Sequence, residues 1–463
     1  MATSMLEDQL KEQYLGKTLH DVPTPSVILD LAKLEVNCQR MLDAVDRLSL
    51  SWRPHIKTHK TTQLTRLQVG DDASTPVKLV VSTVLEAENS VPLLKGYQGK
   101  GRKVNVLLGV PLFPSGVDRL SSISSQLGPE GLALMIDHPE QLSLVEVIRE
   151  RSGHQPLCFM KVDAGYHRAG VIPSTPECEF LVDAIVSSAD RGHCVFHGIY
   201  AHAGQSYDCR EDWQALDFLT AEFKALEAVA AVVRKRRPSQ PLTLSVGATP
   251  QSTSFQHPDI KSDSPSDPRA GLVSEYMQRL TSQGLRLEVH AGVYPTLDLQ
   301  QLATHARDTT LLSSSNIAIS VLFEVSSLYP RRGPKGTTEA MINGGCLALG
   351  REPCADMGPE KGKHYNGFGI VTPWRTGNPE PGQAFPAVHG GWQVGKVSQE
   401  HGILRWKGPP EEEIELKYGQ RVRIWPNHSC VAGACYDKYF IVDSRLKGRE
   451  DEIIDVWPRW RGW

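Results

Sequence analysis

The segment Arg53–Lys60 (RPHIKTHK) combines a short extended run with a cluster of basic side chains. Side chains alternate between the two faces of a strand, so His55 and Lys57 share a face, and Lys57 is the last residue of that face before the strand ends. At the rim of a (β/α)8 barrel, such a lysine can form a Schiff base with a carbonyl cofactor when burial or neighbouring positive charge lowers its pKa. We therefore predict that Lys57 is catalytic, with the other basic residues of the segment as its neighbours. Lys60 is the alternative lysine, and a solvated basic loop is the alternative without function.

Two further segments carry groups suited to a planar cofactor. Arg168 lies between two glycines of Lys161–Gly170, where the backbone can approach a ligand closely and the guanidinium can hold an oxyanion such as a phenolate. Tyr200 and His202 fall on one face of a predicted strand, in a segment that ends at Tyr207, and their rings can stack on a ligand ring. The alternatives are an exposed arginine in a glycine-rich turn and two ordinary core residues.

Small residues and hydroxyl groups follow the last two predicted barrel strands, at Gly247-Ala-Thr249 and at His290-Ala-Gly292-Val-Tyr294. Such residues can present backbone N–H groups to a phosphate, and barrels often bind phosphate after their last two strands. This placement agrees with that of the lysine segment, and together they indicate a cofactor site at one end of a barrel.

A possible metal site lies in the segment Pro426–Cys430, where His428 and Cys430 are two residues apart. On a strand both side chains would point the same way. An imidazole and a thiolate suit zinc. Two protein ligands are fewer than the usual three or four, so water or substrate would complete the coordination shell. A chance pair of histidine and cysteine is the alternative.

Eight strand-like runs alternate with helical segments, which is typical of a parallel α/β barrel. The runs are Trp52–Lys57, Lys78–Val84, Lys103–Val110, Leu132–Asp137, Leu157–Asp163, Val195–His202, Leu242–Ala248 and Leu285–His290. The strand at Ser26–Asp30 is not needed for this barrel, and short strands punctuated by glycine and proline follow Asp308. We therefore predict a TIM-like (β/α)8 barrel over residues 32–305. A β-rich domain over 1–31 and 306–463 would carry the metal site and include the N-terminal strand.

The composition describes a globular protein with a large core. The chain has 463 residues, of which 40% are hydrophobic and 22% are charged, and its net charge is −3. These values argue against a general role on nucleic acid or on a membrane surface, and no uninterrupted apolar run is long enough to cross a bilayer. Nine cysteines are dispersed without a CxxC pair, which favours free thiols in a reducing compartment, so we expect a cytoplasmic protein.

Six motifs in one order resemble those of the fold-type III pyridoxal-phosphate enzymes, the alanine racemase superfamily. They are RPHIKTHK, YAHAGQSY, LSVGATP, EVHAGVY, VSQEHG and PNHSC. More narrowly, the chain resembles the eukaryotic, fungal-type, zinc-dependent D-serine dehydratases over nearly its whole length. The resemblance implies a homodimer and a zinc ion held by His428 and Cys430. His290 stands where alanine racemases have an arginine near the pyridine nitrogen, which argues against racemisation. The implied pyridoxal 5'-phosphate site comprises Lys57, Arg168, Tyr200, Tyr207, Gly247, Thr249, His290, Gly292 and Tyr294.

The reaction implied by the resemblance is β-elimination of D-serine to pyruvate and ammonia. Lys57 would remove the α-proton, and zinc would assist the departure of hydroxide. The expected partner is a small D-amino acid. The nearest alternative is a D-threonine aldolase, which shares the barrel and the lysine motif but cleaves D-β-hydroxy amino acids by a retro-aldol reaction. The metal pair of that family typically ends in a carboxylate, whereas this chain has Cys430. A non-catalytic pyridoxal-phosphate carrier, a lone barrel without a metal site, is a further alternative.

Overall fold

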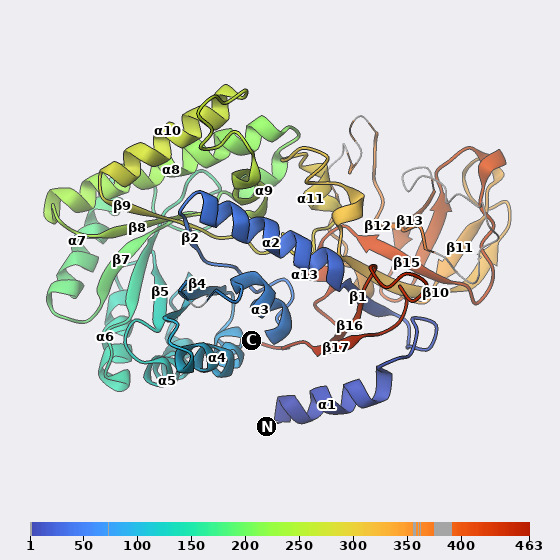
Figure 1. The fold of residues 1–463 in the computed structure, drawn as a ribbon, viewed down its shortest axis with the longest axis horizontal. Helices are drawn as coiled ribbons and strands as arrows, with labels where there is room; N and C mark the ends of the chain where they lie inside the picture. Colours follow the sequence, from blue (N-terminus) through green and yellow to red (C-terminus); the bar gives the residue numbers. More distant parts are fainter. Residues whose placement is uncertain (1, 73, 355–357, 360, 362, 375–390) are drawn as a thin grey trace. The chain divides into compact units, whose positions relative to one another are not determined.

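The chain forms two compact units in the computed structural model, which describes residues 2–72, 74–354, 358–359, 361, 363–374 and 391–463 (Figure 1). The barrel unit comprises Cys38–Gly292 and Trp460–Trp463, and the β-rich unit comprises Met1–Asn37 and Val293–Arg459. The predicted barrel, 32–305, extends further, but Leu297 and Asp298 accept hydrogen bonds from Ser429 and so belong with the β-rich unit. A loop that the sequence predicts at Gly377–Pro386 lies outside the described residues.

Eight parallel strands form the sheet of the barrel unit, in the order β2-β9-β8-β7-β6-β5-β4-β3. They are β2 (Ser51–Trp52), β3 (Val77–Val81), β4 (Val104–Pro111), β5 (Leu132–Ile136), β6 (Leu157–Lys161), β7 (Val195–Tyr200), β8 (Leu242–Val246) and β9 (Leu285–Val289). The segment after β2 nearly closes the barrel, because Ile56 N donates to Val80 O at 3.1 Å and Val80 N donates to Pro54 O at 2.9 Å. The predicted barrel and its eight strands are confirmed.

The strand predicted at Trp52–Lys57 is shorter than expected. Regular pairing ends at Trp52. Two residues later comes Pro54, which has no N–H to donate to a neighbouring strand. Beyond β2, Arg53 N still donates to Val289 O and His55 N to Ala291 O, at 3.0 and 2.9 Å. Lys57 therefore follows an irregular extended segment that is tied to the barrel, rather than the end of a regular strand.

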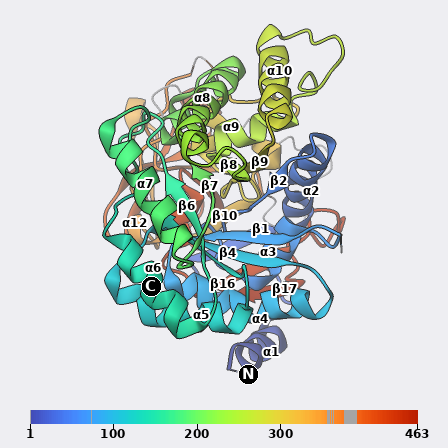
Figure 2. The ribbon, with the colours of Figure 1, turned by 90° about the vertical axis from the view of Figure 1, so that its left-hand side faces the viewer.

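Helices surround the strands of the barrel unit (Figures 1 and 2). They are α3 (Thr62–Val69), α4 (Val84–Gly99), α5 (Val117–Leu127), α6 (Gln141–Ser152), α7 (Pro176–Asp190), α8 (Asp212–Arg236), α9 (Thr249–Thr253) and α10 (Pro268–Ser282). The helix α2 (Leu31–Arg47) contains the boundary between the units. Apolar side chains from β3 to β7, among them Leu107 and Phe159, fill the interior of the barrel. No described helix is both long and apolar enough to cross a membrane.

The β-rich unit is built on one nine-stranded sheet in the order β11-β14-β13-β12-β15-β10-β1-β16-β17. Its strands are β1 (Ser26–Asp30), β10 (Ile319–Tyr329), β11 (Glu339–Ile342), β12 (Gly369–Val371), β13 (Trp392–Val397), β14 (Gly402–Trp406), β15 (Arg421–Pro426), β16 (Lys438–Val442) and β17 (Asp455–Pro458). Its helices are α1 (Ala2–Tyr14), α11 (Leu299–Ala303), α12 (Cys346–Leu349) and α13 (Ser429–Ala432). The strand β1 pairs antiparallel with β10 and parallel with β16. This confirms that the N-terminal strand leaves the barrel and joins the C-terminal β domain.

Candidate active site

Lys57 lies at the carboxyl-terminal end of the barrel strands, called the barrel mouth below, and its side chain is half-buried. His55 Nδ1 accepts a hydrogen bond from Lys57 N at 3.3 Å, and His55 Nε2 lies 3.2 Å from Ser82 Oγ. Burial lowers the pKa of His55 and of His202 well below the ordinary value, and the charge of Lys57 lowers both pKa values further. Lys57 is therefore surrounded by imidazoles that are neutral at physiological pH.

The basic residues at the two ends of the lysine segment, which the sequence predicts as charged neighbours of Lys57, are each paired with a carboxylate. Arg53 is fully buried, and its Nε lies 2.7 Å from Glu288 Oε1. Lys60 Nζ lies 3.0 Å from Glu86 Oε1. Because Lys60, the alternative lysine, is held in this ion pair, the geometry favours Lys57 as the reactive amine.

The ring side chains that the sequence analysis placed near the cofactor, Tyr200, His202 and His290, lie together at the barrel mouth. Tyr200 stacks on His290, with ring centroids 4.1 Å apart and ring planes inclined by 11°. His202 lies 6.1 Å from His290 on the same measure. Burial lowers the pKa of His290 to about 3, although the charge of Glu288 opposes this shift. His290, which the sequence analysis assigned to the cofactor, is thus a neutral imidazole packed against a buried tyrosine.

A hydrogen-bond chain fixes the tautomer of His290. Ser245 Oγ lies 3.0 Å from Glu288 Oε1 and 3.1 Å from His290 Nδ1. Burial alone would raise the pKa of Glu288, but Arg53 and Lys78 hold it well below its ordinary value, so the carboxylate is ionised and only accepts hydrogen bonds. Ser245 therefore donates to Glu288 and accepts from His290 Nδ1. The Nε2 atom of His290 is left as an acceptor; it is buried and has no hydrogen-bond partner in the described part of the chain.

Glu222, which the sequence analysis did not single out, joins three loops at the mouth from its place on α8. It accepts hydrogen bonds from Ala203 N at 3.0 Å, from Gln251 Nε2 at 2.7 Å and from the backbone of Gly247. Burial raises the pKa of Glu222 to about 7, although these hydrogen bonds oppose the shift. Because the N–H of Gly247 already donates to Glu222, it is not available to a phosphate. A phosphate site here would therefore depend on Thr249, the first residue of α9, and on the backbone beside it.

Two predicted site glycines allow close approaches of the chain. A Cβ atom on Gly247, whose φ is +157°, would lie 1.9 Å from His290 O. A Cβ atom on Gly292 would lie 3.3 Å from the Cβ of His55. Gly247, which follows β8, therefore lies against His290, which follows β9, and Gly292, three residues beyond the end of β9, lies against the lysine segment.

The remaining predicted cofactor residues lie in different surroundings. Arg168 is exposed and lies 5.1 Å from the ring centroid of Tyr166, although its charge contributes to lowering the pKa of His202. Tyr207 is half-buried in the short 3-10 helix that follows β7. Tyr294 is buried and belongs to the β-rich unit. The structure thus brings Lys57 together with Tyr200, His202 and His290.

His428 and Cys430 interact within the β-rich unit, but the expectation that they share a strand is wrong. The strand β15 ends at Pro426, and His428 caps the one-turn helix α13. Ser429 between them starts this helix, and its N–H donates to Asp298 Oδ2 at 2.8 Å. Burial alone would lower the pKa of His428, but Cys430, through charge and a hydrogen bond, and Asp298 raise it to about 9. No cluster of three or more His, Cys, Asp or Glu side chains suited to a metal occurs among the described residues.

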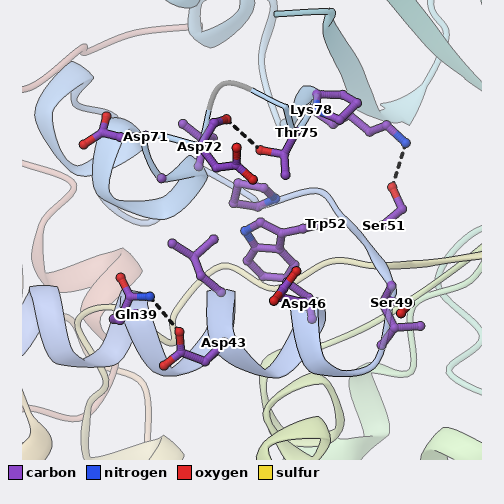
Figure 3. Close-up of a pocket in the computed structure, with 17 residues that line it drawn as sticks. Gln39, Asp43, Asp46, Ser49, Ser51, Trp52, Asp71, Asp72, Thr75 and Lys78 are labelled. Atoms are coloured by element: carbon purple, nitrogen blue, oxygen red, sulfur yellow. Dashed lines mark hydrogen bonds between the residues drawn. The ribbon is translucent and has the colours of Figure 1, made fainter.

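A cavity of about 420 Å³ lies near the amino-terminal ends of β2 and β3 in the barrel unit (Figure 3). None of the predicted site residues lines it. Some of its polar groups bind one another: Gln39 Nε2 donates to Asp43 Oδ1 at 2.7 Å, and Lys78 Nζ donates to Ser51 Oγ at 2.7 Å. Lys78 Nζ also donates to Oε2 of Glu288, which does not line the cavity, at 3.0 Å. The cavity is therefore separate from the barrel mouth, and its wall supplies one partner of the buried Glu288.

Comparisons with known proteins define the class of this fold. The family model described as alanine racemase, N-terminal domain, matches residues 29–264, and the one described as putative serine dehydratase domain matches residues 318–442. Among solved structures, D-threo-3-hydroxyaspartate dehydratase from Delftia sp. HT23 is similar, with a TM-score of 0.71 and 23% identity over 96% of this chain and 100% of that chain. D-threonine aldolase from Filomicrobium marinum is also similar, with a TM-score of 0.68 and 18% identity over 96% of both chains. The chain is an enzyme with an alanine racemase-like barrel and a C-terminal antiparallel β domain.

Two curated relatives narrow this class. D-serine dehydratase from Schizosaccharomyces pombe is 36% identical over 99% of this chain and 96% of the relative. D-serine dehydratase from Saccharomyces cerevisiae is 32% identical over 97% of this chain and 99% of the relative. The chain therefore belongs to the D-serine dehydratase family of pyridoxal-phosphate enzymes, which confirms the resemblance found in its motifs.

Proposed function

We propose that this chain catalyses the pyridoxal-phosphate-dependent β-elimination of D-serine to pyruvate and ammonia. The observation that carries the proposal is Lys57 at the barrel mouth, next to His55 and His202, which are neutral. The full-length similarity to two fungal D-serine dehydratases supports the choice of substrate.

The barrel mouth fits a polar aromatic cofactor. Buried polar atoms without a hydrogen-bond partner among the described residues follow or end β7, β8 and β9: Gln205 Oε1, Ser206 Oγ, Gln251 Oε1 and His290 Nε2. Such atoms are costly unless a ligand or water binds them, so their accumulation supports a polar ligand here. Within the barrel unit, the residues proposed to hold the cofactor are Lys57, Arg168, Tyr200, Tyr207, Gly247, Thr249, His290 and Gly292. Tyr294, in the β-rich unit, stays a prediction from the sequence.

Pyridoxal phosphate, when bound, supplies an electron sink for the negative charge left at Cα by loss of the α-proton. Lys57 would hold the cofactor covalently, and its amine, once displaced by the amino group of D-serine, would take the α-proton. His55 holds the backbone of Lys57 through its Nδ1 atom. Because His55 and His202 are neutral, they can exchange hydrogen bonds with a substrate without adding charge at physiological pH.

His428 and Cys430 would hold a zinc ion, since they combine an imidazole and a thiol that already interact with each other. Zinc would act as a Lewis acid that makes the β-hydroxyl group a better leaving group. A cysteine-to-alanine variant of the similar D-threo-3-hydroxyaspartate dehydratase has been solved in a metal-free form, which supports a link between a cysteine and a metal in this fold.

The main alternative is retro-aldol cleavage of a D-β-hydroxy amino acid. D-threonine aldolase from Arthrobacter sp. is 27% identical over 42% of this chain, and 3-hydroxy-D-aspartate aldolase from Paracoccus denitrificans is 24% identical over 96% of it. The two fungal dehydratases are more similar, at 36% and 32% identity over 99% and 97% of this chain. Cys430, in place of the carboxylate expected of an aldolase metal pair, also favours dehydration. The β-rich unit argues against a non-catalytic carrier, which would consist of a barrel alone.

We further propose a cytoplasmic homodimer. None of the nine cysteines, all within the described residues, forms a disulfide, which supports a reducing compartment. Light scattering coupled to size-exclusion chromatography tests the dimer, and a monomeric mass would contradict it.

Product analysis with D-serine and D-threonine as separate substrates, with and without a chelator, tests the function. Pyruvate from D-serine that is lost on chelation and restored by zinc is the expected result. Glycine and acetaldehyde from D-threonine, without pyruvate from D-serine, would assign the chain to the aldolases instead.

A further inference from the structure

Lys60, the second lysine of RPHIKTHK, has no part in the proposed chemistry, yet the backbone around it is tightly held. Its φ is +51°, a region that residues other than glycine seldom adopt. Lys60 N donates to Ile56 O at 2.9 Å and closes the turn that contains Lys57. Lys60 O accepts a hydrogen bond from Trp460 N at 2.9 Å. A strained conformation of this kind persists only where surrounding contacts maintain it.

The side chain of Lys60 is held as firmly as its backbone. Its Nζ lies 3.0 Å from Glu86 Oε1, and the two side chains are only 15% and 1% exposed. Glu86 Oε2 accepts a hydrogen bond from Ser82 N at 2.9 Å, and Ser82 Oγ lies 3.2 Å from His55 Nε2. One short stretch of chain, from the end of β3 to the first turn of α4, therefore holds the lysine turn at both ends, with Lys57 between them.

We propose that Lys60 is a positioning residue that holds the turn around Lys57 in its reactive conformation, through its ion pair with Glu86 and its hydrogen bond from Trp460. The proposal rests on the proposed role of Lys57 as the Schiff-base lysine. A displacement of about 1 Å at a reacting group can cost about 100-fold in rate. Loss of the ion pair should therefore lower kcat, while substrate binding changes little.

The test compares Lys60→Met, Lys60→Arg and the double variant Lys60→Met/Glu86→Gln with the control Glu88→Gln. Glu88 lies two residues from Glu86 on α4, but it pairs with Arg119 at 2.6 Å, and both side chains are more than a third exposed, at 35% and 40%. The double variant leaves no buried charge without a partner, so it keeps the test informative where Lys60→Met alone does not fold. Lys60→Arg retains the positive charge and should restore the pair.

Two measurements on the holoenzyme decide the outcome: amide hydrogen exchange over residues 53–61, and kcat and KM for D-serine. We expect Lys60→Met and the double variant to exchange faster in this segment and to lose about 10- to 100-fold in kcat, with KM nearly unchanged. Lys60→Arg and Glu88→Gln should behave like the unmodified protein. Unchanged kcat in the double variant would overturn the proposal, whether or not exchange is faster. If the unmodified protein makes no pyruvate from D-serine, the proposed function fails, whereas the exchange rates still decide whether Lys60 holds the turn.

Discussion

The lysine turn and the histidine–cysteine pair, in different units of the chain, are held in different ways. The turn is fixed on both sides of Lys57, by His55 against Ser82 and by Lys60 against Glu86. The pair lies on a one-turn helix that Ser429 anchors to Asp298 and to Leu297 O. A reactive amine needs a rigid position before any ligand arrives, whereas a metal ion can itself complete the geometry of its ligands. Changes in the turn should therefore affect chemistry first, and changes near the pair should affect metal content first.

The largest expected effect comes from Lys57→Ala. This change removes the amine that would bind the cofactor and take the α-proton, so kcat/KM for D-serine should fall by about 10⁴-fold or more. The absorption of the Schiff base should disappear as well. Lys100→Ala, at the exposed end of α4, is the control and should keep both. Measurable turnover by Lys57→Ala above that of free cofactor would show that another lysine carries the reaction.

A smaller effect is expected from His428→Ala, which should keep the cofactor spectrum but lose bound zinc. Without a Lewis acid at the leaving hydroxyl group, kcat should fall by about 10³-fold, equivalent to the several kcal/mol that metals supply in such steps. Zinc content by mass spectrometry and turnover of D-serine are the measurements. Cys435→Ala, which removes an exposed thiol outside the pair, is the control. Full activity of His428→Ala in metal-free buffer would separate the pair from catalysis.

Glu222, at the barrel mouth, should make the stability of the barrel unit depend on pH. Burial raises its pKa from 4.5 to about 7, so the folded state binds its proton more tightly than the unfolded state. The resulting stabilisation is complete below pH 4.5 and is lost as pH rises to about 7, which amounts to about 3 kcal/mol. Glu222→Gln should remove this dependence, so that the variant gains stability relative to the unmodified protein between pH 4.5 and 7.5. Urea unfolding at both pH values measures it, and parallel pH profiles of the two proteins would refute the assignment.

The smallest effect is expected from Asp298→Asn, which weakens the anchor of α13. Asp298 is buried and accepts hydrogen bonds from Ser429 N at 2.8 Å and Ser429 Oγ at 3.0 Å. Residues that orient metal ligands typically contribute about 10- to 100-fold to metal affinity, so zinc should bind more weakly by this factor. A competition titration with a chromophoric chelator measures the change. Unchanged affinity would mean that the pair does not depend on this anchor.

The fold could largely be predicted because buried parallel strands appear in the sequence as apolar runs. Runs such as Leu132–Ile136 and Leu242–Val246 are buried at every position. The surplus strand Ser26–Asp30 could be recognised for the same reason. Its neighbours could not, because pairing with β10 and β16 depends on contacts between residues about 300 and 400 positions apart in the chain.

Residues of the candidate site could be predicted where they belong to a sequence motif, but not where their contacts depend on the register between neighbouring strands. Lys57 could be predicted from the motif RPHIKTHK. The hydrogen bonds that link Glu288, Ser245 and His290 could not, because they depend on Ser245 lying opposite Glu288 in neighbouring strands. Glu222 left a usable signal, since it is a carboxylate on the apolar face of α8, three residues after Leu219. The helix at Ser429 was missed because the spacing of His428 and Cys430 also suits a strand.

The most direct test of the account is to locate the cofactor on the chain. Borohydride reduction of the holoenzyme, followed by proteolysis and mass spectrometry, marks the lysine that forms the Schiff base. We expect the label on Lys57, with Lys60 unlabelled because it is paired with Glu86. A label on Lys60, or on the buried Lys161, would contradict both the proposed catalytic residue and the positioning role of Lys60.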